Sequence, residues 1–254
     1  MRLVSWNLNA RVRAIPHQIG AIRGLAPDVV ALQEVTAASW ASLEPALHQT
    51  GLGHTLLGTD TTPTKASSRF PRFVAIASRW PVSRGAGGPG RTPEIVLCAE
   101  VLRPGASFEI IGVHIPLATR EPPLKVEVQE AVAAHVAASC HNPLILCGDF
   151  NSPMAETADG TIVPFAAKRG DRAREAELAI TYGVPKSGMK DAFRLVHGYG
   201  RSDFSWRVPQ KSSDNAYRLD HVFVSQGFTV IACWYAHELT VGNSDHSPIV
   251  ADLF

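Results

Sequence analysis

The sequence has few charged residues and almost no net charge. Of its 254 residues, 19% are charged, where about 25% is usual. Its 24 Lys and Arg nearly balance 23 Asp and Glu, which leaves a formal charge of +1. Because 45% of the residues are hydrophobic, this composition excludes a disordered chain and predicts a large core. The charge balance excludes an indiscriminate polyanion binder, so any nucleic-acid function requires a local site.

Cysteine is also scarce, and long apolar runs are absent. The four cysteines form no C-x-x-C pair and have no metal-finger spacing, so we expect buried, reduced thiols in a cytoplasmic protein. No apolar run approaches about 18 residues, and the chain starts with a strand pattern instead of a signal sequence, so we predict no membrane span. G-x-S-x-G, P-loop and G-x-G-x-x-G motifs are missing, which predicts no nucleotide cofactor and no serine hydrolase.

The chain contains many short apolar runs separated by turn signals. They predict strands at 2–8, 29–32, 74–78, 95–102, 108–114, 144–147, 221–225, 230–234 and 248–253. Helical signals favour helices at 16–25, 37–49, 124–138, 172–181 and 190–196. No repeat or linker divides the sequence, so we expect residues 1–254 to form one domain. The two groups of strands favour two sheets covered by outer helices, a layered α/β fold.

Polar residues gather at the ends of six apolar runs. These clusters are Asn7-Leu8-Asn9, Gln33-Glu34, His114, Gly148-Asp149-Phe150-Asn151, Asp220-His221 and Ser244-Asp245-His246. One such cluster is an ordinary turn, whereas six that each end a hydrophobic run predict a common site. Because side chains alternate along a strand, we expect Asn7 and Asn9 to share one face, and Asp149 and Asn151 likewise.

The residue types in these clusters favour phosphate-ester hydrolysis. Hard oxygen donors suit Mg²⁺ or Mn²⁺ better than zinc, and the candidate ligands are Glu34 and Asp245, assisted by Asn7 or Asn9. A divalent cation, an activated water and cationic or amide donors around a phosphate oxyanion form a hydrolytic site. Glycosidase chemistry has no use for so many amides and imidazoles.

Two of the clusters supply acid–base groups. Asp149 beside Asn151 is suited to deprotonating and orienting a water molecule. His246 would have a raised pKa if a carboxylate such as that of Asp220 lies against it, and would then stay protonated near neutrality.

In their order and spacing, the clusters resemble those of the endonuclease/exonuclease/phosphatase superfamily. The first fifty residues are most similar to its exonuclease III branch, through RLVSWNLN at 2–9, PHQ at 16–18 and DVVALQE at 28–34. The superfamily is matched by GDFN at 148–151, RLDHVFVS at 218–225 and SDHSP at 244–248. The resemblance covers essentially the whole chain. It implies a four-layer αββα sandwich of two mixed β-sheets flanked by helices, with the site at the sheet edge.

The resemblance also implies which residues bind the metal. Glu34 would bind the catalytic ion, with Asn9 near it and Asp245 at or near a second metal position. Asn7 would hold the phosphate or the metal shell.

The remaining roles that the resemblance implies are catalytic. Asp149 would activate the nucleophilic water, and Asn151 would help to orient it. His246, oriented by Asp220, would stabilise the transition state. His114 would contact the scissile phosphate.

Departures from the family pattern concern the substrate. Where abasic-site enzymes of the branch usually have Tyr, this chain has His114, which resembles deoxyribonuclease I and the phosphatases. His221 stands where abasic-site enzymes often carry Tyr. Ser205 stands where the pocket aromatic is expected, and the aromatic residues of that segment are Phe204, Trp206 and Tyr217. Recognition of a base-less sugar is therefore one option among several.

Positive charge is concentrated in two segments. No acidic residue occurs between Thr61 and Pro93, and a second basic stretch that includes Arg218 leads into the Asp220 motif. Phosphate contacts from loops beside a site would explain both segments. The candidates for such contacts are Lys65, Arg69, Arg72, Arg207 and Lys211.

We therefore predict a Mg²⁺- or Mn²⁺-dependent phosphodiesterase that acts on DNA as an endonuclease or 3′-exonuclease, with abasic-site cleavage and DNA repair as options. We expect a monomer with DNA as its partner. The alternative is a phosphoesterase of the same superfamily acting on RNA, a phosphotyrosyl-DNA end or an inositol-phosphate headgroup. A binding module without catalysis is disfavoured because the set of catalytic residue types is intact.

Overall fold

Two six-stranded sheets form the centre of the molecule. The computed structural model describes residues 1–59, 72–85, 88–89, 92–117, 122–208 and 216–254. In spatial order, the first sheet contains β15 (Val230–Tyr235), β16 (Ile249–Leu253), β1 (Arg2–Asn7), β2 (Val29–Val35), β4 (Phe73–Ser78) and β3 (His54–Leu57). The second contains β11 (Lys190–Asp191), β14 (Asp220–Val224), β8 (Leu144–Asp149), β7 (Phe108–His114), β6 (Val96–Val101) and β5 (Val82–Arg84). Both sheets are mixed, because β1 pairs with β2 and β7 with β8 in parallel, while their other neighbours pair antiparallel.

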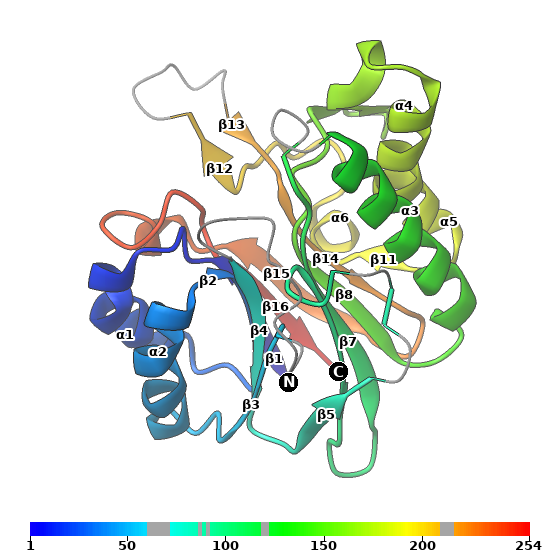
Figure 1. Cartoon of the computed structure of the whole chain (residues 1–254). Coiled ribbons are helices and arrows are strands. Elements are labelled where there is room, and N and C mark those ends of the chain that lie inside the picture. The colour runs from blue at the N-terminus through cyan, green and yellow to red at the C-terminus, as the bar shows by residue number, and fades with distance from the viewer. Residues whose placement is uncertain (60–71, 86–87, 90–91, 118–121, 209–215) are drawn as a thin grey trace.

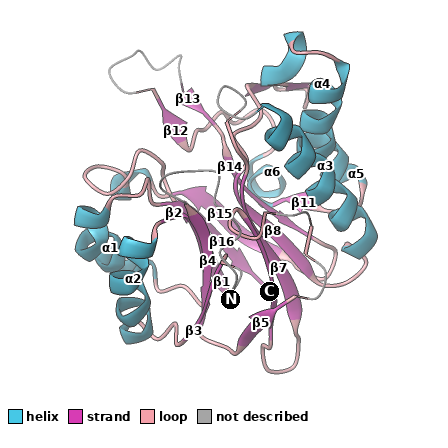
Figure 2. Ribbon diagram, in the orientation of Figure 1, coloured by secondary structure: helices cyan, strands magenta, loops and turns pink. Residues whose placement is uncertain are grey.

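Helices cover the outer faces of the two sheets. The first sheet carries α1 (Ile15–Leu25) and α2 (Ala37–Gln49), drawn in blue in Figure 1, and the second carries α3 (Pro122–Ser139), α4 (Asp171–Leu178) and α5 (Val184–Lys186), drawn in green and yellow. The short helix α6 (Ala192–His197) packs against β14 and β15 at the side of the sandwich. Figure 2 shows the strands between these two groups of helices. The predicted four-layer αββα sandwich is confirmed.

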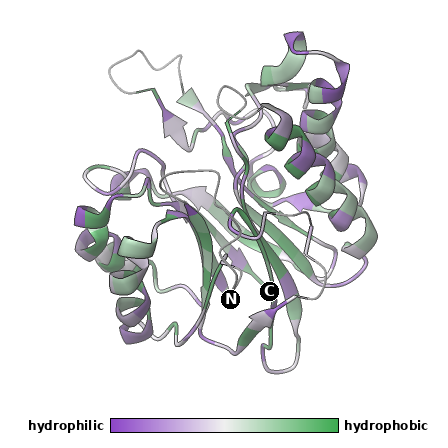
Figure 3. Ribbon diagram, in the orientation of Figure 1, coloured by the Kyte–Doolittle hydropathy of each residue, from purple (hydrophilic) through white to green (hydrophobic). Residues whose placement is uncertain are grey.

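Strand alternation explains why the sandwich has three hydrophobic layers. In β1, Leu3 faces the core between the sheets, whereas Val4 and Trp6 face α1 and α2. In β8, Cys147 faces the same inter-sheet core and Leu146 faces α3. Because successive strand residues point to opposite faces, a strand buried on both sides reads as a continuous apolar run. Figure 3 accordingly shows hydrophobic strands between helices whose exposed sides are hydrophilic.

Two of the expected helices end or begin elsewhere. The helix expected at 172–181 is α4, which ends at Leu178 and continues as a wider π turn over Ala179–Gly183. The helix expected at 190–196 begins only at Ala192, because Lys190–Asp191 pairs with β14 as a strand. The carboxylate of Asp191 then accepts a hydrogen bond from Arg194 N at 3.1 Å and caps α6.

Two small hairpins complete the described strands. One pairs β9 (Ala155–Glu156) with β10 (Ile162–Val163), and the other pairs β12 (Trp206–Arg207) with β13 (Ala216–Tyr217). The second lies at the upper left in Figure 1. All four cysteines are buried and free, as the sequence predicts. Within the ranges that the structure describes, no helix has the length and apolarity needed to cross a membrane.

Candidate active site

A row of three ionisable side chains runs across one edge of the second sheet. Register places His114 of β7 beside Asp149 of β8, and Asp220 of β14 beside Asp149 on its other side. Cys147 and Val222 lie two residues away on β8 and β14 and face the inter-sheet core. Because residues two apart share a face, Asp149 and Asp220 also point between the sheets. Sequence alternation thus brings these groups together.

The first sheet adds Asn7 to this row from the end of β1. Asn7 Nδ2 donates a hydrogen bond to Asp149 Oδ2 at 2.9 Å, which links the two sheets. Ser244 Oγ donates to the backbone oxygen of Asn7 at 2.6 Å and fixes this strand end. Because β1 ends at Asn7 and Asn9 has a φ of +52°, the expectation that Asn7 and Asn9 share a strand face is wrong. Asn9 lies in the following turn, where its N–H donates to Asn7 Oδ1 at 2.9 Å.

Asn151 holds the other oxygen of Asp149. The backbone N–H of Asn151 donates to Asp149 Oδ1 at 2.9 Å, and its side chain donates to Ile115 O at 2.8 Å. The backbone turns sharply here, with a φ of +47° at Asn151, so the two residues meet through a turn instead of a shared strand face. The ammonium of buried Lys125 donates to Asn151 O at 2.8 Å and secures the turn.

His246 and Asp220 form a buried ion pair beside Asp149. His246 Nδ1 lies 2.7 Å from Asp220 Oδ2, and His246 Nε2 lies 3.9 Å from Asp149 Oδ2. Burial alone would lower the pKa of His246, but the carboxylates of Asp220 and Asp149 outweigh it and raise the pKa to about 10. Asp220 is itself fixed, because Ser205 Oγ accepts from its N–H at 2.9 Å and Tyr235 donates to its backbone oxygen at 2.6 Å. His246 is therefore an imidazolium at neutral pH.

The environment of Asp149 makes it a stronger base than an ordinary aspartate. Burial raises its pKa, and the neighbouring Asp220 carboxylate raises it further. The charges of His246 and His114 act in the opposite direction without cancelling the effect of burial. A carboxylate whose pKa is raised above its ordinary value is a better acceptor of a proton from water.

Glu34 reaches the site through an irregularity in β2. The register of β2 against β4 shifts between Leu32 and Val35, and Glu34 has a φ of +56°. Leu32 and Val35 both face the helices, so the two residues between them are turned to the other side. There, Glu34 Oε1 lies 3.6 Å from His114 Nε2, and its other oxygen pairs with the guanidinium of Arg72. Strained backbone of this kind is common at functional sites.

The oxygen donors at this edge fit a hard divalent cation. Glu34 contributes a carboxylate, and Asn7 contributes an amide oxygen that accepts one hydrogen bond, from Asn9 N. Carboxylate and amide oxygens are the donors that Mg²⁺ and Mn²⁺ prefer. Donor atoms of Asp149, Asp220 and His246 also lie within 4.8 Å of one another.

An aromatic side chain borders the site through Asp245. Trp206 Nε1 donates to Asp245 Oδ2 at 3.2 Å, and the indole lies 6.5 Å from the ring of His246 between centroids. Trp206 also stacks on Tyr217, with 6.1 Å between the ring centroids. These two candidate pocket residues therefore form one aromatic surface next to the imidazolium.

Phe204, the third candidate pocket residue, packs elsewhere. Its ring stacks on His237 at 4.4 Å between centroids. The guanidinium of Arg207 lies over the Phe204 ring, 4.3 Å from its centroid. Arg207 is exposed, so its charge is accessible to a phosphate near the hairpin of β12 and β13.

The other residues of the two basic segments divide into three cases. Arg72, a candidate, pairs with Glu34 inside the site. Arg218 of the second basic stretch is buried, with Nε 2.6 Å from Glu156 and Nη2 2.7 Å from Asp191, so its charge is not available to a phosphate. Burial opposes ionisation of Glu156, yet the charge of Arg218 lowers its pKa to about 2. Three candidates lie outside the described residues, namely Lys65, Arg69 and Lys211.

Sequence reasoning missed several supports of the site. Ser205 Oγ accepts hydrogen bonds from the backbone N–H groups of Leu219 and Asp220, both at 2.9 Å. Trp6 Nε1 donates to the backbone oxygen of His246 at 2.9 Å. The serine in place of an aromatic residue was the only sequence signal for these contacts.

Comparisons with known proteins agree with this geometry. A profile of the Endonuclease/Exonuclease/phosphatase family matches residues 4–246. An AP endonuclease from Archaeoglobus fulgidus superposes with a TM-score of 0.73 at 18% identity, with 99% of this chain and 98% of that chain covered. The 3′ phosphatase NExo from Neisseria bound to product DNA hairpin gives 0.73 at 21% identity, with 100% and 99% covered. The 3′-5′ exonuclease NExo from Neisseria meningitidis gives 0.71 at 22%, with 99% of each chain covered. No curated protein matches the sequence. At these identities, the structural likeness establishes the fold.

Proposed function

Because the chain belongs to the Endonuclease/Exonuclease/phosphatase family, we propose that it is a Mg²⁺- or Mn²⁺-dependent phosphodiesterase that hydrolyses phosphate esters in DNA. Membership makes it a hydrolase of nuclease or phosphatase type. The observation that supports the proposal most is that a base and a cationic donor lie close together at one sheet edge. A carboxylate with a raised pKa, Asp149, lies 3.9 Å from an imidazolium, His246.

In this proposal, Asp149 is the general base. Asn7 and Asn151 each donate to one of its two oxygens and so fix the plane of the carboxylate. Oδ2 also accepts a longer hydrogen bond from Asn151 Nδ2 at 3.4 Å, whereas Oδ1 accepts only the one from Asn151 N. Oδ1 therefore keeps a lone pair with which the carboxylate holds a water and accepts its proton as the water attacks phosphorus. Asn151 positions this base through a turn that has its own support in Lys125.

His246 stabilises the charge that develops on the phosphoryl oxygens. Its Nδ1–H is held by Asp220 at 2.7 Å, which aims Nε2–H toward Asp149 and the space beside it. A buried cationic donor that is already oriented stabilises an oxyanionic transition state without reorganisation. His114 Nε2 lies 3.9 Å from Asp149 Oδ2, and in this proposal it donates to a second phosphoryl oxygen.

The metal-holding residues in the proposal are Glu34, Asn9 and Asp245, with Asn7 holding the phosphate or the metal shell. When bound, a divalent cation supplies Lewis-acid stabilisation of the phosphoryl oxygens and favours ionisation of water. Arg72 now pairs with Glu34, so this guanidinium must release the carboxylate that the cation would use.

DNA is the proposed substrate because an aromatic and a basic surface adjoin the acid–base groups. Trp206 and Tyr217 offer stacking faces for an unpaired base or a base-less sugar, and exposed Arg207 offers a phosphate contact. Two structural neighbours, an AP endonuclease and a 3′ phosphatase bound to a DNA hairpin, support endonucleolytic or 3′-end processing. A role in DNA repair as a cytoplasmic monomer belongs to the same proposal.

A second candidate function is hydrolysis of a phosphate ester outside DNA. His114 favours it, since an imidazole 3.6 Å from Glu34 and 3.9 Å from Asp149 gives the site a further donor for a terminal phosphate. RNA, a phosphotyrosyl-DNA end and an inositol-phosphate headgroup are the substrate classes concerned.

A substrate panel separates the two. The protein is incubated with Mg²⁺ or Mn²⁺ and with single-stranded, nicked and abasic duplex DNA, a 3′-phosphorylated DNA, RNA and a water-soluble inositol polyphosphate. We expect turnover of a DNA substrate that is lost on adding a chelator and falls at least ~10³-fold in Glu34→Gln. Glu44→Gln, on α2 and away from the site, is the matched control. Turnover of the inositol compound alone would replace the DNA proposal with the second candidate.

A further inference from the structure

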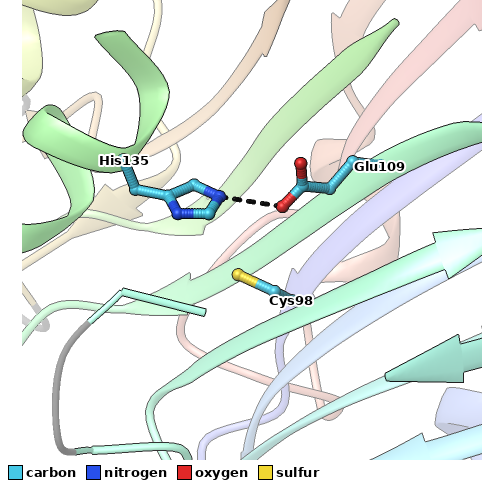
Figure 4. Close-up of side chains that lie close together, drawn as sticks. All are labelled: Cys98, Glu109 and His135. Atoms are coloured by element: carbon cyan, nitrogen blue, oxygen red, sulfur yellow. Dashed lines mark hydrogen bonds and ion pairs between the residues drawn. The ribbon is translucent and has the colours of Figure 1, made fainter. Parts of the chain in front are cut away.

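A second cluster of metal-ligating side chains lies on the outer face of the second sheet. It consists of Cys98 on β6, Glu109 on β7 and His135 on α3, which point toward one another in Figure 4. His135 Nε2 lies 2.9 Å from Glu109 Oε1, and one donor atom from each residue lies within 4.8 Å of the others. The active-site side chains point between the sheets, so the sheet separates the two clusters.

Register and helix periodicity produce this cluster. Cys98 stands opposite Ile111 in the antiparallel pair of β6 and β7, and Glu109 is two residues from Ile111, so both cluster residues share the face covered by α3. On α3, Val132 and Val136 pack against this face. His135 lies between them at the rim of the buried stripe and is half-buried over Glu109.

An unfavourable pair of like charges adjoins the cluster. Glu100 stands directly opposite Glu109 in the ladder of β6 and β7. Like charges in that position are destabilising. Among the described residues, Glu109 forms an ion pair with His135, and no Lys or Arg pairs with Glu100. A bound cation would offset the repulsion between the two carboxylates, and the thiol and the imidazole beside them would supply further ligands.

We propose that Cys98, Glu109 and His135 form a second divalent-cation site that takes Zn²⁺. Thiolate, imidazole and carboxylate donors suit this borderline-soft ion, in contrast to the oxygen donors at the active site. Water completes the fourth position of a tetrahedron. The inference stands independently of the proposed function.

Binding would replace protons and adjust the spacing of the cluster. Burial, aided by the charge of Glu109, raises the pKa of the Cys98 thiol to about 12, so the free thiol is protonated at neutral pH. The cation would displace this proton to solvent as the Zn–S bond forms. His135 then binds through Nε2 with its proton on Nδ1, and Glu109 keeps an oxygen on the ion. Zinc–ligand bonds of about 2.0–2.3 Å place donor atoms roughly 3.3–3.5 Å apart. The 2.9 Å pair of His135 and Glu109 would therefore open by about 0.5 Å, and the sulfur, which lies within 4.8 Å of the other donor atoms, would settle at that spacing. The bound ion would tie α3 to β6 and β7.

Cobalt absorption tests this site directly. The full-length protein is stripped with a chelator, dialysed and titrated with Co²⁺. We expect a thiolate-to-cobalt charge-transfer band in the near ultraviolet that saturates at one equivalent and is bleached by Zn²⁺. Cys98→Ser should abolish the band, whereas Cys140→Ser, which removes another buried thiol at the end of α3, should keep it. His135→Gln should weaken cobalt binding by more than ~10-fold.

Controls separate this site from the active site. Glu34→Gln should leave the charge-transfer band unchanged, because the proposed active-site ligands contain no sulfur. Zn²⁺ should raise the Tm of the wild type and of Glu34→Gln but not of His135→Gln, a surface-rim substitution that remains informative if Cys98→Ser fails to fold. The proposal is overturned by a wild-type protein without the band, by a band that persists in Cys98→Ser, or by a band lost in Glu34→Gln.

Discussion

Replacing Asp220 by Asn tests the ion pair that sets the charge of His246. The substitution keeps the shape of the side chain and removes its negative charge 2.7 Å from His246 Nδ1. The contacts that hold residue 220 in place come from Ser205 and Tyr235 to its backbone, so they persist in the variant. The change therefore acts on the imidazole and not on the position of the strand.

The size of the effect follows from the pKa of His246. A pKa of about 10 lies roughly 3.5 above the ordinary value near 6.5, which corresponds to about 5 kcal/mol in favour of the imidazolium. Asp220 acts against burial and is aided by Asp149, so we expect its removal to lower the pKa of His246 by about 2. Loss of the oriented cationic donor should lower turnover by ~10²–10⁴-fold.

Two measurements on the metal-free and metal-loaded protein check this prediction. NMR titration of the His246 imidazole gives its pKa in the wild type and in Asp220→Asn, and steady-state kinetics give the loss of turnover. Asp252→Asn, which breaks a surface pair with Arg2, is the matched control. Because the folded pKa is raised, the stability that the pair contributes is complete below about pH 6.5 and is lost as pH rises through about 10. An unchanged pKa of His246 together with turnover within ~10-fold of the wild type would show that Asp220 does not set the charge of His246.

Three further predictions concern the surroundings of the site. Arg72→Ala frees the Glu34 carboxylate, so Mn²⁺ should bind more tightly, by ~10-fold in calorimetry; weaker binding would mean that Arg72 helps to hold the ion. Arg218 lowers the pKa of Glu156 to about 2, so this carboxylate contributes stability above about pH 4.5 that is lost as pH falls toward 2. In urea unfolding, the free energy of unfolding of Glu156→Gln should fall by about 3 kcal/mol less than that of the wild type over this pH range, and the same pH dependence in both proteins would contradict the pairing. Trp206→Ala should raise KM for DNA ~10-fold or more with a smaller change in kcat, whereas an unchanged KM would remove the stacking surface from the substrate path.

Much of the fold was predictable because the buried strands read as apolar runs. The runs around Leu3, Cys147 and Val222 are buried on both faces, and each became a central strand. Short edge strands such as β3 and β5 were not predicted, because three or four half-exposed residues give no periodic signal. The start of α6 was missed since Lys190–Asp191 is a strand only through its pairing with β14.

The candidate site was also predictable only in part. The meeting of Asp149 and Asp220 follows from alternation and from strand ends at one edge, which sequence shows. The orientation of Glu34 depends on a register shift and a positive φ, which alternation alone would have contradicted. The burial of Arg218 depends on Glu156, 62 residues away in the chain, and no local pattern signals such a pair.

The proposed function depends on Asp149 activating water for metal-dependent cleavage of DNA. The most direct test is single-turnover cleavage of an abasic and a nicked duplex by the wild type and by Asp149→Asn, with saturating Mg²⁺ and with DNA binding followed by fluorescence anisotropy. We expect cleavage by the wild type and a rate at least ~10³-fold lower in the variant, while DNA affinity changes little. Cleavage by Asp149→Asn within ~10-fold of the wild-type rate would contradict it.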